Sequence, residues 1–484
     1  MFKRGKLGGL DGGLYRPLCE SDMRHIHETV MRIFQEVGIQ VLTKRGFDLF
    51  REKGARVSEE KQIVYISSGM FEDFIDLVPS EIILHGREEK NNIFLGGRRV
   101  HFGSGGTALN VLDLETGEKR PSTLEDVQNV SRLLDKLENV HFEVIPVYPN
   151  DLPVEKVDVN RFFAALQNTT KHVMGGTYTL EGTKNVIRLG EILAGSAEKL
   201  RREPFISLIT CVMSPLKIEE TYGEFLMTVA EAEIPVAIPA EPIAGATSPV
   251  TLAGTVANMC CETLGGILLA QLVNPGTPCL FGSVGTGADM RTMGYVSGSV
   301  EEGLINAAAA QMAQFYGLPF YATAGQSDAK CVDAQAGWEG AITNLLVGMA
   351  GANFIHDAVG LLEFCMTASY EKYVTDNEII GEVMRVLQGI EVNPETLALQ
   401  VTRRVGPGEH YLSDDHTCKH MRREHFIPSL ADRNDMETWI ALGRKDTFQR
   451  AHEIAMEILK THHPKPLDSG KVEIIRKTFE GLKQ

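Results

Sequence analysis

From about residue 98 onward, short apolar runs alternate with amphipathic stretches of helical length. Each run ends in a polar or glycine-rich elbow, and the stretch after it repeats its apolar residues at helical spacing. Eight such runs begin near residues 98, 139, 171, 204, 234, 276, 318 and 351. The pattern predicts eight consecutive strand-then-helix units.

This alternation defines the expected fold class. Strands that alternate with helices lie parallel in one sheet and are joined by right-handed crossovers. Eight units close naturally into a TIM (β/α)8 barrel, whereas a doubly wound open sheet is the competing arrangement. We therefore expect an α/β protein with the barrel at residues 98–390.

Two flanking segments complete the expected organisation. Residues 1–97 contain three stretches with helical periodicity, the first of them ending at Gly38, and predict an N-terminal helical segment packed on the barrel. Residues 391–484 are polar and rich in helical patterns, and they predict a helical C-terminal segment. The N-terminal segment contains no obvious catalytic motif.

Local signals near the first and last units predict specific elements. Residues 109–120 contain a turn signal between two apolar stretches, which indicates a hairpin. Ser122 with Glu125, and Thr375 with Glu378, have the three-residue spacing of a capping box. We expect one helix to begin at each pair.

Composition narrows the class of partner and the compartment. The net charge of −16 and the absence of a basic block argue against a nucleic-acid partner. No run approaches the roughly 20 apolar residues that span a bilayer, and no apolar stretch follows the basic N-terminal residues as in a signal peptide. The eight cysteines form no C-x-x-C pair, so we expect reduced thiols, a cytoplasmic protein and no metal site.

A TIM barrel places function at the carboxyl ends of its strands, so the polar residues at those positions are candidates. Each is also interpretable as an ordinary polar loop residue. They are Ser104, Thr107, Asn150, Asp151, Tyr178, Met213, Glu241, Thr286, Asp289, Gln326, Asp328, His356 and Asp357.

Two of these candidates have particular chemistry. His356 lies two residues after Phe354, so both side chains share one face of the eighth strand. A histidine there could accept a proton or bind a carboxylate, or it could be a hydrogen-bonded core residue. Glu241 lies between prolines on an apolar run, where its carboxylate needs a cationic partner from a ligand or from a neighbouring arginine.

Two other readings of the chain are weaker. Gly103, Gly105 and Ala108 match G-x-G-x-x-A, but a hairpin instead of a helix follows, so we exclude NAD binding. Lys330, after the seventh strand, could form a Schiff base in an aldolase or lyase. Its acidic neighbours Asp328 and Asp333 favour a charged lysine in an ion pair instead.

Five segments, in this order, together resemble the trimethylamine methyltransferase family: IFQEVGIQVL, VPSEIILHGRE, HFGSGGTALNVLDLETGEKRPST, QSDAKCVDAQAGWEG and RREHFIPSLADRNDMETW. The resemblance spans nearly the whole chain and implies a TIM barrel. It also implies transfer of a methyl group from a methylated amine to the cobalt of a cognate corrinoid protein. Archaeal trimethylamine enzymes of the family carry pyrrolysine after the seventh strand, where residues 328–333 of this chain are all standard.

The resemblance therefore implies a member without pyrrolysine, similar to glycine betaine methyltransferase. The substrate would be a quaternary amine such as glycine betaine, proline betaine or carnitine, and cob(I)alamin on a partner protein would accept the methyl group. No covalent catalytic residue is expected, because the protein would act by alignment. The expected substrate-binding residues are Phe102, Tyr178, Glu241, Arg291, Tyr321, Gln326, Asp328, Phe354 and His356.

Aromatic faces and Glu241 would hold the cation, and His356, Gln326 and Arg291 would donate to a substrate carboxylate. We also expect a homo-oligomer. Two other functions stay open: a Schiff-base aldolase or lyase that uses Lys330, and a methylamine-binding protein without catalytic activity.

Overall fold

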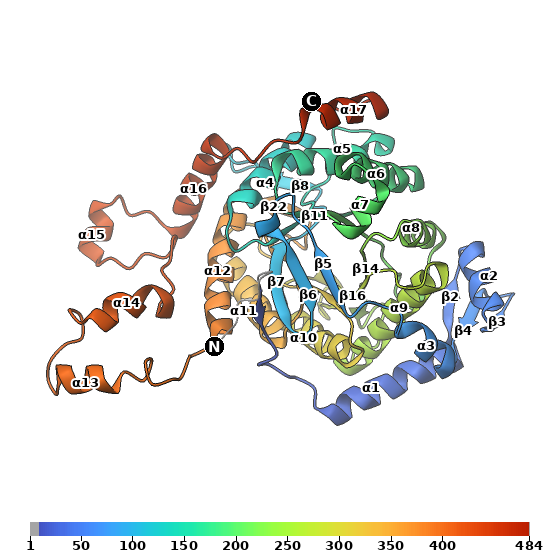
Figure 1. The fold of residues 1–484 in the computed structure, drawn as a ribbon, viewed down its shortest axis with the longest axis horizontal. Helices are drawn as coiled ribbons and strands as arrows, with labels where there is room; N and C mark the ends of the chain where they lie inside the picture. Colours follow the sequence, from blue (N-terminus) through green and yellow to red (C-terminus); the bar gives the residue numbers. More distant parts are fainter. Residues whose placement is uncertain (1–8, 484) are drawn as a thin grey trace.

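Eight parallel strands close into a barrel in the computed structural model, which describes residues 9–483 (Figure 1). The barrel closes where the last strand pairs with the first, with Phe354 opposite His101. The predicted TIM barrel is confirmed, and the open sheet is excluded. In order around the barrel, the strands are β7 (Arg99–Ser104), β10 (Phe142–Val144), β11 (His172–Gly176), β12 (Ile206–Ile209), β14 (Val236–Ala240), β16 (Cys279–Ser283), β19 (Phe320–Thr323) and β20 (Phe354–Val359).

A ring of helices surrounds these strands (Figure 1). They are α4 (Leu124–Lys136), α5 (Val154–Asn168), α6 (Leu180–Ala194), α7 (Ala197–Arg202), α8 (Glu220–Glu231), α9 (Leu252–Val273), α10 (Val300–Phe315), α11 (Ala334–Ala350) and α12 (Tyr370–Gln388). Contrary to the sequence expectation, α9 is long and apolar enough to cross a membrane by length and composition. However, 89% of its most apolar window is buried inside the protein, as in a core helix.

The floor of the barrel is filled by side chains. The Phe142 and Phe354 rings stack with their centroids 3.4 Å apart, and Tyr321 stacks on Phe354 at 5.5 Å. The hairpin of β5 (Glu81–Leu84) and β6 (Ile93–Gly96) contributes further apolar side chains to this inner cluster. The amino-terminal end is therefore packed, and open space is left at the carboxyl end.

The N-terminal segment is only partly helical. The three expected helices are α1 (Glu20–Arg32), continued by a π-helical turn at Ile33–Val37, α2 (Lys44–Glu52) and α3 (Ser68–Ile75). The segment also contains short strands, which the sequence did not reveal because two to four residues are too few to show alternation. They are β1 (Leu10–Asp11), which pairs with β7, and β2 (Ile39–Val41), β3 (Arg56–Ser58) and β4 (Ile63–Tyr65), which form a sheet with β13 (Lys217–Ile218).

The predicted hairpin is confirmed as β8 (Asn110–Leu112) and β9 (Lys119–Pro121). The capping box after it lies one residue later than predicted, at Thr123 and Asp126. Ser122 does not cap the helix. Its hydroxyl donates a long-range hydrogen bond to the Tyr148 carbonyl at 2.6 Å.

The last barrel helix also begins earlier than predicted. Ser369 caps α12, so Thr375 lies in its second turn and donates to the Glu371 carbonyl. Glu378 does not cap this helix. Its carboxylate accepts hydrogen bonds from residues 429–431 of the C-terminal segment, a long-range partner that local spacing does not reveal.

The C-terminal segment is helical, as predicted. Its helices are α13 (Leu399–Val405), α14 (Asp415–Glu424), α15 (Met436–Ala441), α16 (Thr447–Thr461) and α17 (Ser469–Thr478). Helix α16 packs on α12 and α4, and α17 packs on α6. Residues 391–445, which include α13, α14 and α15, form an arm that stands off the barrel (Figure 1).

Candidate functional site

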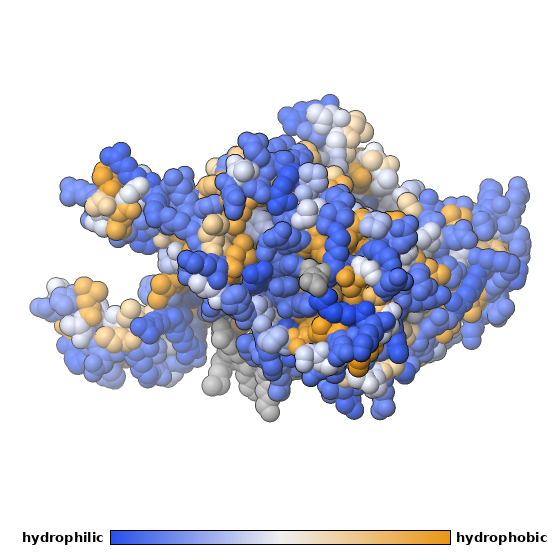
Figure 2. All heavy atoms as spheres, turned by 90° about the horizontal axis from the view of Figure 1, so that it is seen from above, coloured by the Kyte–Doolittle hydropathy of each residue, from blue (hydrophilic) through white to orange (hydrophobic). Residues whose placement is uncertain are grey.

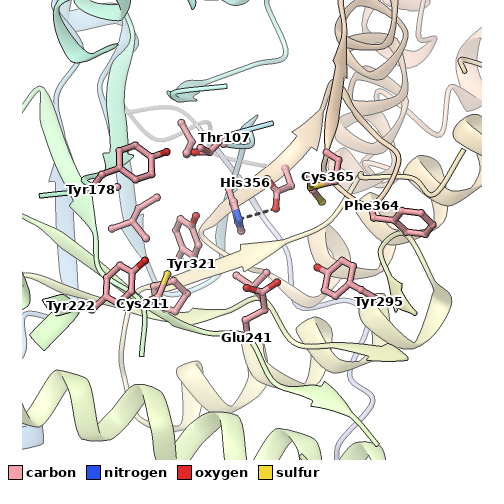
Figure 3. A pocket seen from close by; sticks show the side chains of 18 of the residues that line it. Thr107, Tyr178, Cys211, Tyr222, Glu241, Tyr295, Tyr321, His356, Phe364 and Cys365 are labelled. Atoms are coloured by element: carbon pink, nitrogen blue, oxygen red, sulfur yellow. Dashed lines mark ion pairs between the residues drawn. The ribbon is translucent and has the colours of Figure 1, made fainter. Parts of the chain in front are cut away.

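A cavity of about 750 Å³ occupies the carboxyl ends of the barrel strands (Figure 3). Every one of the eight strands, or the loop after it, contributes to its wall. The lining residues are Gly106, Thr107, Val144, Gly176, Thr177, Tyr178, Ile209, Cys211, Tyr222, Pro239, Glu241, Val284, Gly294, Tyr295, Tyr321, His356, Asp357, Phe364, Cys365 and Met366. Across residues 9–483, no lysine or arginine is among them.

Five aromatic side chains line the cavity: Tyr178, Tyr222, Tyr295, Tyr321 and Phe364. Tyr321 rises from the floor and stacks against the His356 ring with centroids 4.2 Å apart. The face of an aromatic ring carries negative electrostatic potential and attracts a cation within about 6 Å. The cavity therefore suits a positively charged group.

Glu241 is the acidic group on this wall that has no ion pair within the described residues. Its side chain is accessible through the cavity, yet protein atoms surround it. Burial therefore raises the pKa of its carboxyl, which Asp357 raises further, while a hydrogen bond from Tyr295 and the nearby His356 act in the opposite direction. A bound cation would stabilise the ionised carboxylate.

The side chains of His356 and Asp357 lie in ion-pair contact beside Glu241 (Figure 3). The His356 Nε2 lies 2.8 Å from Asp357 Oδ2, and its Nδ1 lies 2.6 Å from the Ala322 carbonyl oxygen. Because a carbonyl only accepts, Nδ1 carries a proton.

The backbone explains why two successive side chains reach the same cavity. Side chains alternate between the faces of a regular strand. Here the pairing of β20 with β7 is interrupted by a bulge, and Asp357 has a φ of +59°. Gly105 makes room for this arrangement, since a Cβ on it would lie 1.6 Å from Asp357 Oδ1. The G-x-G sequence therefore permits close packing at the site.

Two thiols also line the cavity. Burial, with a contribution from Glu241, raises the pKa of Cys211 to about 12. Burial likewise raises the pKa of Cys365 well above its ordinary value. Both thiols are protonated at neutral pH, so neither is an effective nucleophile. Sequence reasoning treated them as core filler because isolated cysteines give no spacing signal.

Four of the nine residues expected to bind substrate line this cavity: Tyr178, Glu241, Tyr321 and His356. They come from the third, fifth, seventh and eighth strands or the loops that follow them.

Three others lie elsewhere. Phe354 lies in the packed floor beneath Tyr321. Phe102 faces outward from the barrel, where its ring packs near Gly348 of α11. Arg291 is exposed, and its guanidinium pairs with Asp289 at 2.7 Å.

Gln326 and Asp328 lie behind the wall and support it. Gln326 Nε2 donates to Glu302 Oε1 at 2.5 Å, and Asp328 accepts from the backbone and hydroxyl of Ser297. Gln326 thereby joins the elbow after the seventh strand to helix α10, and Asp328 joins it to the loop before that helix. Lys330 is exposed and donates to the Asp328 carbonyl at 2.7 Å, outside the cavity.

Several wall residues were not expected from the sequence. Tyr222 lies on α8, Tyr295 follows a long excursion after the sixth strand, and Phe364 follows the eighth. None of them ends an apolar run, so the strand-end filter misses them. Only the loop conformations bring them to the cavity.

A family model and individual relatives of known sequence all match this chain over most of its length. A family model described as trimethylamine methyltransferase (MTTB) matches residues 11–480. The chain is 37% identical over 461 residues to trimethylamine methyltransferase MttB of Desulfitobacterium hafniense, covering 95% of this chain and 92% of that protein. It is 34% identical to a glycine betaine methyltransferase of Desulfitobacterium hafniense, covering 94% of each chain.

An archaeal relative is similar to the same extent: the chain is 35% identical to trimethylamine methyltransferase MttB of Methanosarcina barkeri, covering 96% and 94% of the two chains. Among solved structures, a hydroxylamine complex of MtmB superposes with a TM-score of 0.50 at 14% identity, covering 91% of this chain and 93% of that one. At this identity the superposition shows a shared fold.

Proposed function

The chain belongs to the trimethylamine methyltransferase family, and on that premise we propose that it demethylates a quaternary amine and passes the methyl group to a corrinoid protein. The observation that carries the proposal is Glu241, a carboxylate without an ion pair in the described chain, facing an aromatic cavity. Such a cavity is complementary to a fixed positive charge.

The chemistry of a quaternary amine suits this wall. Its nitrogen is already cationic, so a neutral tertiary amine leaves when one methyl group is transferred, and no acid is needed. Glu241 and the tyrosine faces would hold the cation and aim one methyl group toward the open end of the barrel. Glycine betaine is our first candidate, in line with one similar relative, and proline betaine and carnitine are the others.

The methyl acceptor has to enter from outside the chain. The lining thiols, Cys211 and Cys365, are protonated at neutral pH, and residues 9–483 place no lysine on the wall. A corrinoid cobalt(I) on a partner protein supplies the nucleophile. This chain would contribute proximity and alignment, which can lower a barrier substantially without a covalent intermediate. Pyrrolysine is not required in this scheme, since the substrate needs no covalent activation.

The proposal is tested by incubating the purified chain with cob(I)alamin and a panel of quaternary amines while methylcobalamin is followed by absorbance. We expect formation with at least one betaine, and a loss of more than tenfold in Glu241→Gln, because a charged partner is removed. Glu36→Gln, an exposed glutamate paired with Arg32, is the matched control. The absence of methylcobalamin with every amine would refute the proposal.

We also propose that the arm, residues 391–445, contacts a second copy of the chain. The arm is fixed at its base, where Glu378 accepts from residues 429–431. The arm nevertheless leaves large apolar side chains in solvent, on its helices and on the loops between them, and apolar surface is visible on the lobes at the left of Figure 2. They include Val392, Leu397, Leu399, Leu412, Ile427, Met436 and Leu442, and Leu412 is 80% exposed.

Charge and position favour a second copy as the occupant. The whole chain has 48 Lys or Arg and 64 Asp or Glu, so two copies repel each other overall. The arm carries eight Lys or Arg and nine Asp or Glu and is therefore nearly neutral, so that it can approach a second copy without this repulsion. It leaves the barrel after α12, near Leu10 and therefore at the amino-terminal end, away from the cavity mouth that the corrinoid protein must reach. Sedimentation of Leu412→Glu should show a smaller species than wild type. Self-association through the arm would be refuted if the wild type is a monomer, or if Leu412→Glu sediments as the wild type does.

A further inference from the structure

A buried arginine lies directly behind one side of the cavity. Arg161 of α5 is only 1% exposed and is among the largest fully buried side chains. Residues 9–483 offer it no ion pair, and its Nε has no hydrogen-bond partner. Asp158 interacts with Arg161 electrostatically, but its carboxylate accepts hydrogen bonds from the backbone of Tyr178. A buried guanidinium with so few acceptors is costly unless it serves a further purpose.

The guanidinium is directed at two hydroxyls of the cavity wall. Its Nη1 donates to Tyr178 Oη at 2.9 Å, and its Nη2 donates to Thr107 Oγ1 at 3.2 Å and to the Ile145 carbonyl at 3.5 Å. Arginine only donates, so both hydroxyl oxygens act as acceptors toward it. Each hydroxyl proton must then point elsewhere, and neither hydroxyl donates to any acceptor in the described chain. Both side chains line the cavity, which leaves it as the direction for their protons.

The backbone at Thr107 is strained, which indicates that its position is imposed by its surroundings. Thr107 has a φ of +83°, which is rare for a β-branched residue. Such conformations are unfavourable and persist where the surroundings impose them, often at ligand sites. Here the strained residue is one of the two that accept from Arg161. The loop thus holds a hydroxyl on the cavity wall in front of a buried cation.

The donors and the acidic group occupy opposite sides of the cavity. Thr107 follows the first barrel strand and Tyr178 the third, whereas Glu241 follows the fifth and Tyr295 the sixth. Figure 3 shows the same separation, with the Tyr178 hydroxyl directed toward Thr107 and Glu241 on the far side of Tyr321.

We propose that Arg161, through the hydroxyls of Tyr178 and Thr107, forms a carboxylate-binding subsite, so that the enzyme selects zwitterionic betaines over simple quaternary cations. The inference rests on the proposed function and adds the anionic half of the substrate. Arg161 acts as a positioning residue, because it polarises and orients the two hydroxyls that would touch the ligand. Hydrogen bonds to a carboxylate are stronger than those between neutral groups.

The test is a comparison of dissociation constants by calorimetry for glycine betaine, proline betaine and carnitine against choline and tetramethylammonium. Wild type should bind at least one zwitterion more than about tenfold tighter than either cation. Tyr178→Phe keeps the aromatic face and removes the donor, so it should reduce that preference by about 10- to 100-fold, which is the range for a hydrogen bond to a charged group. Affinity for tetramethylammonium should change far less.

Tyr148→Phe is the matched control: its ring lies 5.1 Å from Tyr178 but outside the cavity wall, and the preference should be unchanged. Arg161→Lys and Thr107→Ala extend the test, with near-ultraviolet circular dichroism to verify folding. A wild type that binds all five compounds equally, or a Tyr178→Phe that keeps the preference, overturns the subsite but leaves the proposed function standing. A wild type that binds none of them removes both.

Discussion

The buried ion pair between Lys372 and Asp376 should be the most sensitive point of the barrel near the site. Both side chains lie on α12 and are 1% and 0% exposed, with Lys372 Nζ 2.6 Å from Asp376 Oδ1. Lys372 also donates to the Gly325 carbonyl, and Asp376 accepts from the Gly360 backbone. The pair therefore ties α12 to the ends of the seventh and eighth strands.

Replacing Lys372 alone leaves the buried carboxylate of Asp376 without its cationic partner. Lys372→Met removes the hydrogen bonds of the ammonium and leaves Asp376 with one donor, from Gly360. Breaking a buried pair by removing one partner costs about 3–5 kcal/mol. Burial already raises the pKa of Asp376, and Lys372 opposes that rise, so the variant should raise it further. A carboxyl whose pKa is higher in the folded than in the unfolded protein destabilises the fold only while it is ionised. The loss of unfolding free energy in Lys372→Met should therefore become smaller as the pH falls.

The assay is urea unfolding followed by circular dichroism at pH 8 and pH 5.5. Lys44→Met is the control, because Lys44 and Asp48 have the same i,i+4 spacing on an exposed helix, with Lys44 88% exposed. That change should cost less than about 1 kcal/mol. The double variant Lys372→Met with Asp376→Leu should recover most of the stability. Equal losses for the two lysine variants, or a larger loss at pH 5.5, would refute the reasoning.

Three further predictions concern the cavity. Tetramethylammonium binding, measured by calorimetry, should weaken as the pH falls through the raised pKa of Glu241, and Glu241→Gln should remove that pH dependence. The His356–Asp357 pair is present in both proteins, so the difference between them reports on Glu241. Gly105→Ala should reduce methyl transfer at least tenfold while the far-ultraviolet spectrum stays the same, because the new Cβ displaces Asp357; full activity would contradict it. Phe354→Ala should cost about 3–5 kcal/mol in urea unfolding, since its ring fills the barrel floor, with little change in ligand affinity.

The placement of the two phenylalanines shows where the sequence stops being informative. Phe102 and Phe354 lie on neighbouring strands, yet one packs outside the barrel and the other inside. Parallel barrel strands are buried on both faces, so they lack the alternation that would distinguish the two directions. Their apolar character was predictable, and their orientation was not.

Arg161 and Asp357 show the same limit for polar residues. Arg161 lies in an outer helix, where a charge usually faces solvent, but this helix is buried on most of its surface. Asp357 reaches the cavity only because a bulge and a positive φ break the alternation of β20. No sequence pattern reports either event, because both depend on contacts between residues far apart in the chain.

Sequence patterns alone predicted the barrel, the family and the end of the strands at which the site lies. Each of those depends on local information: the alternation of apolar runs with helical stretches, and segments that resemble a family in order. The tertiary structure decided which side chains meet. It brought Tyr178, Glu241 and His356 to one cavity, and it placed Arg161 behind its wall. The physical reason is that closing the barrel fixes loop positions through long-range packing, which no single segment encodes.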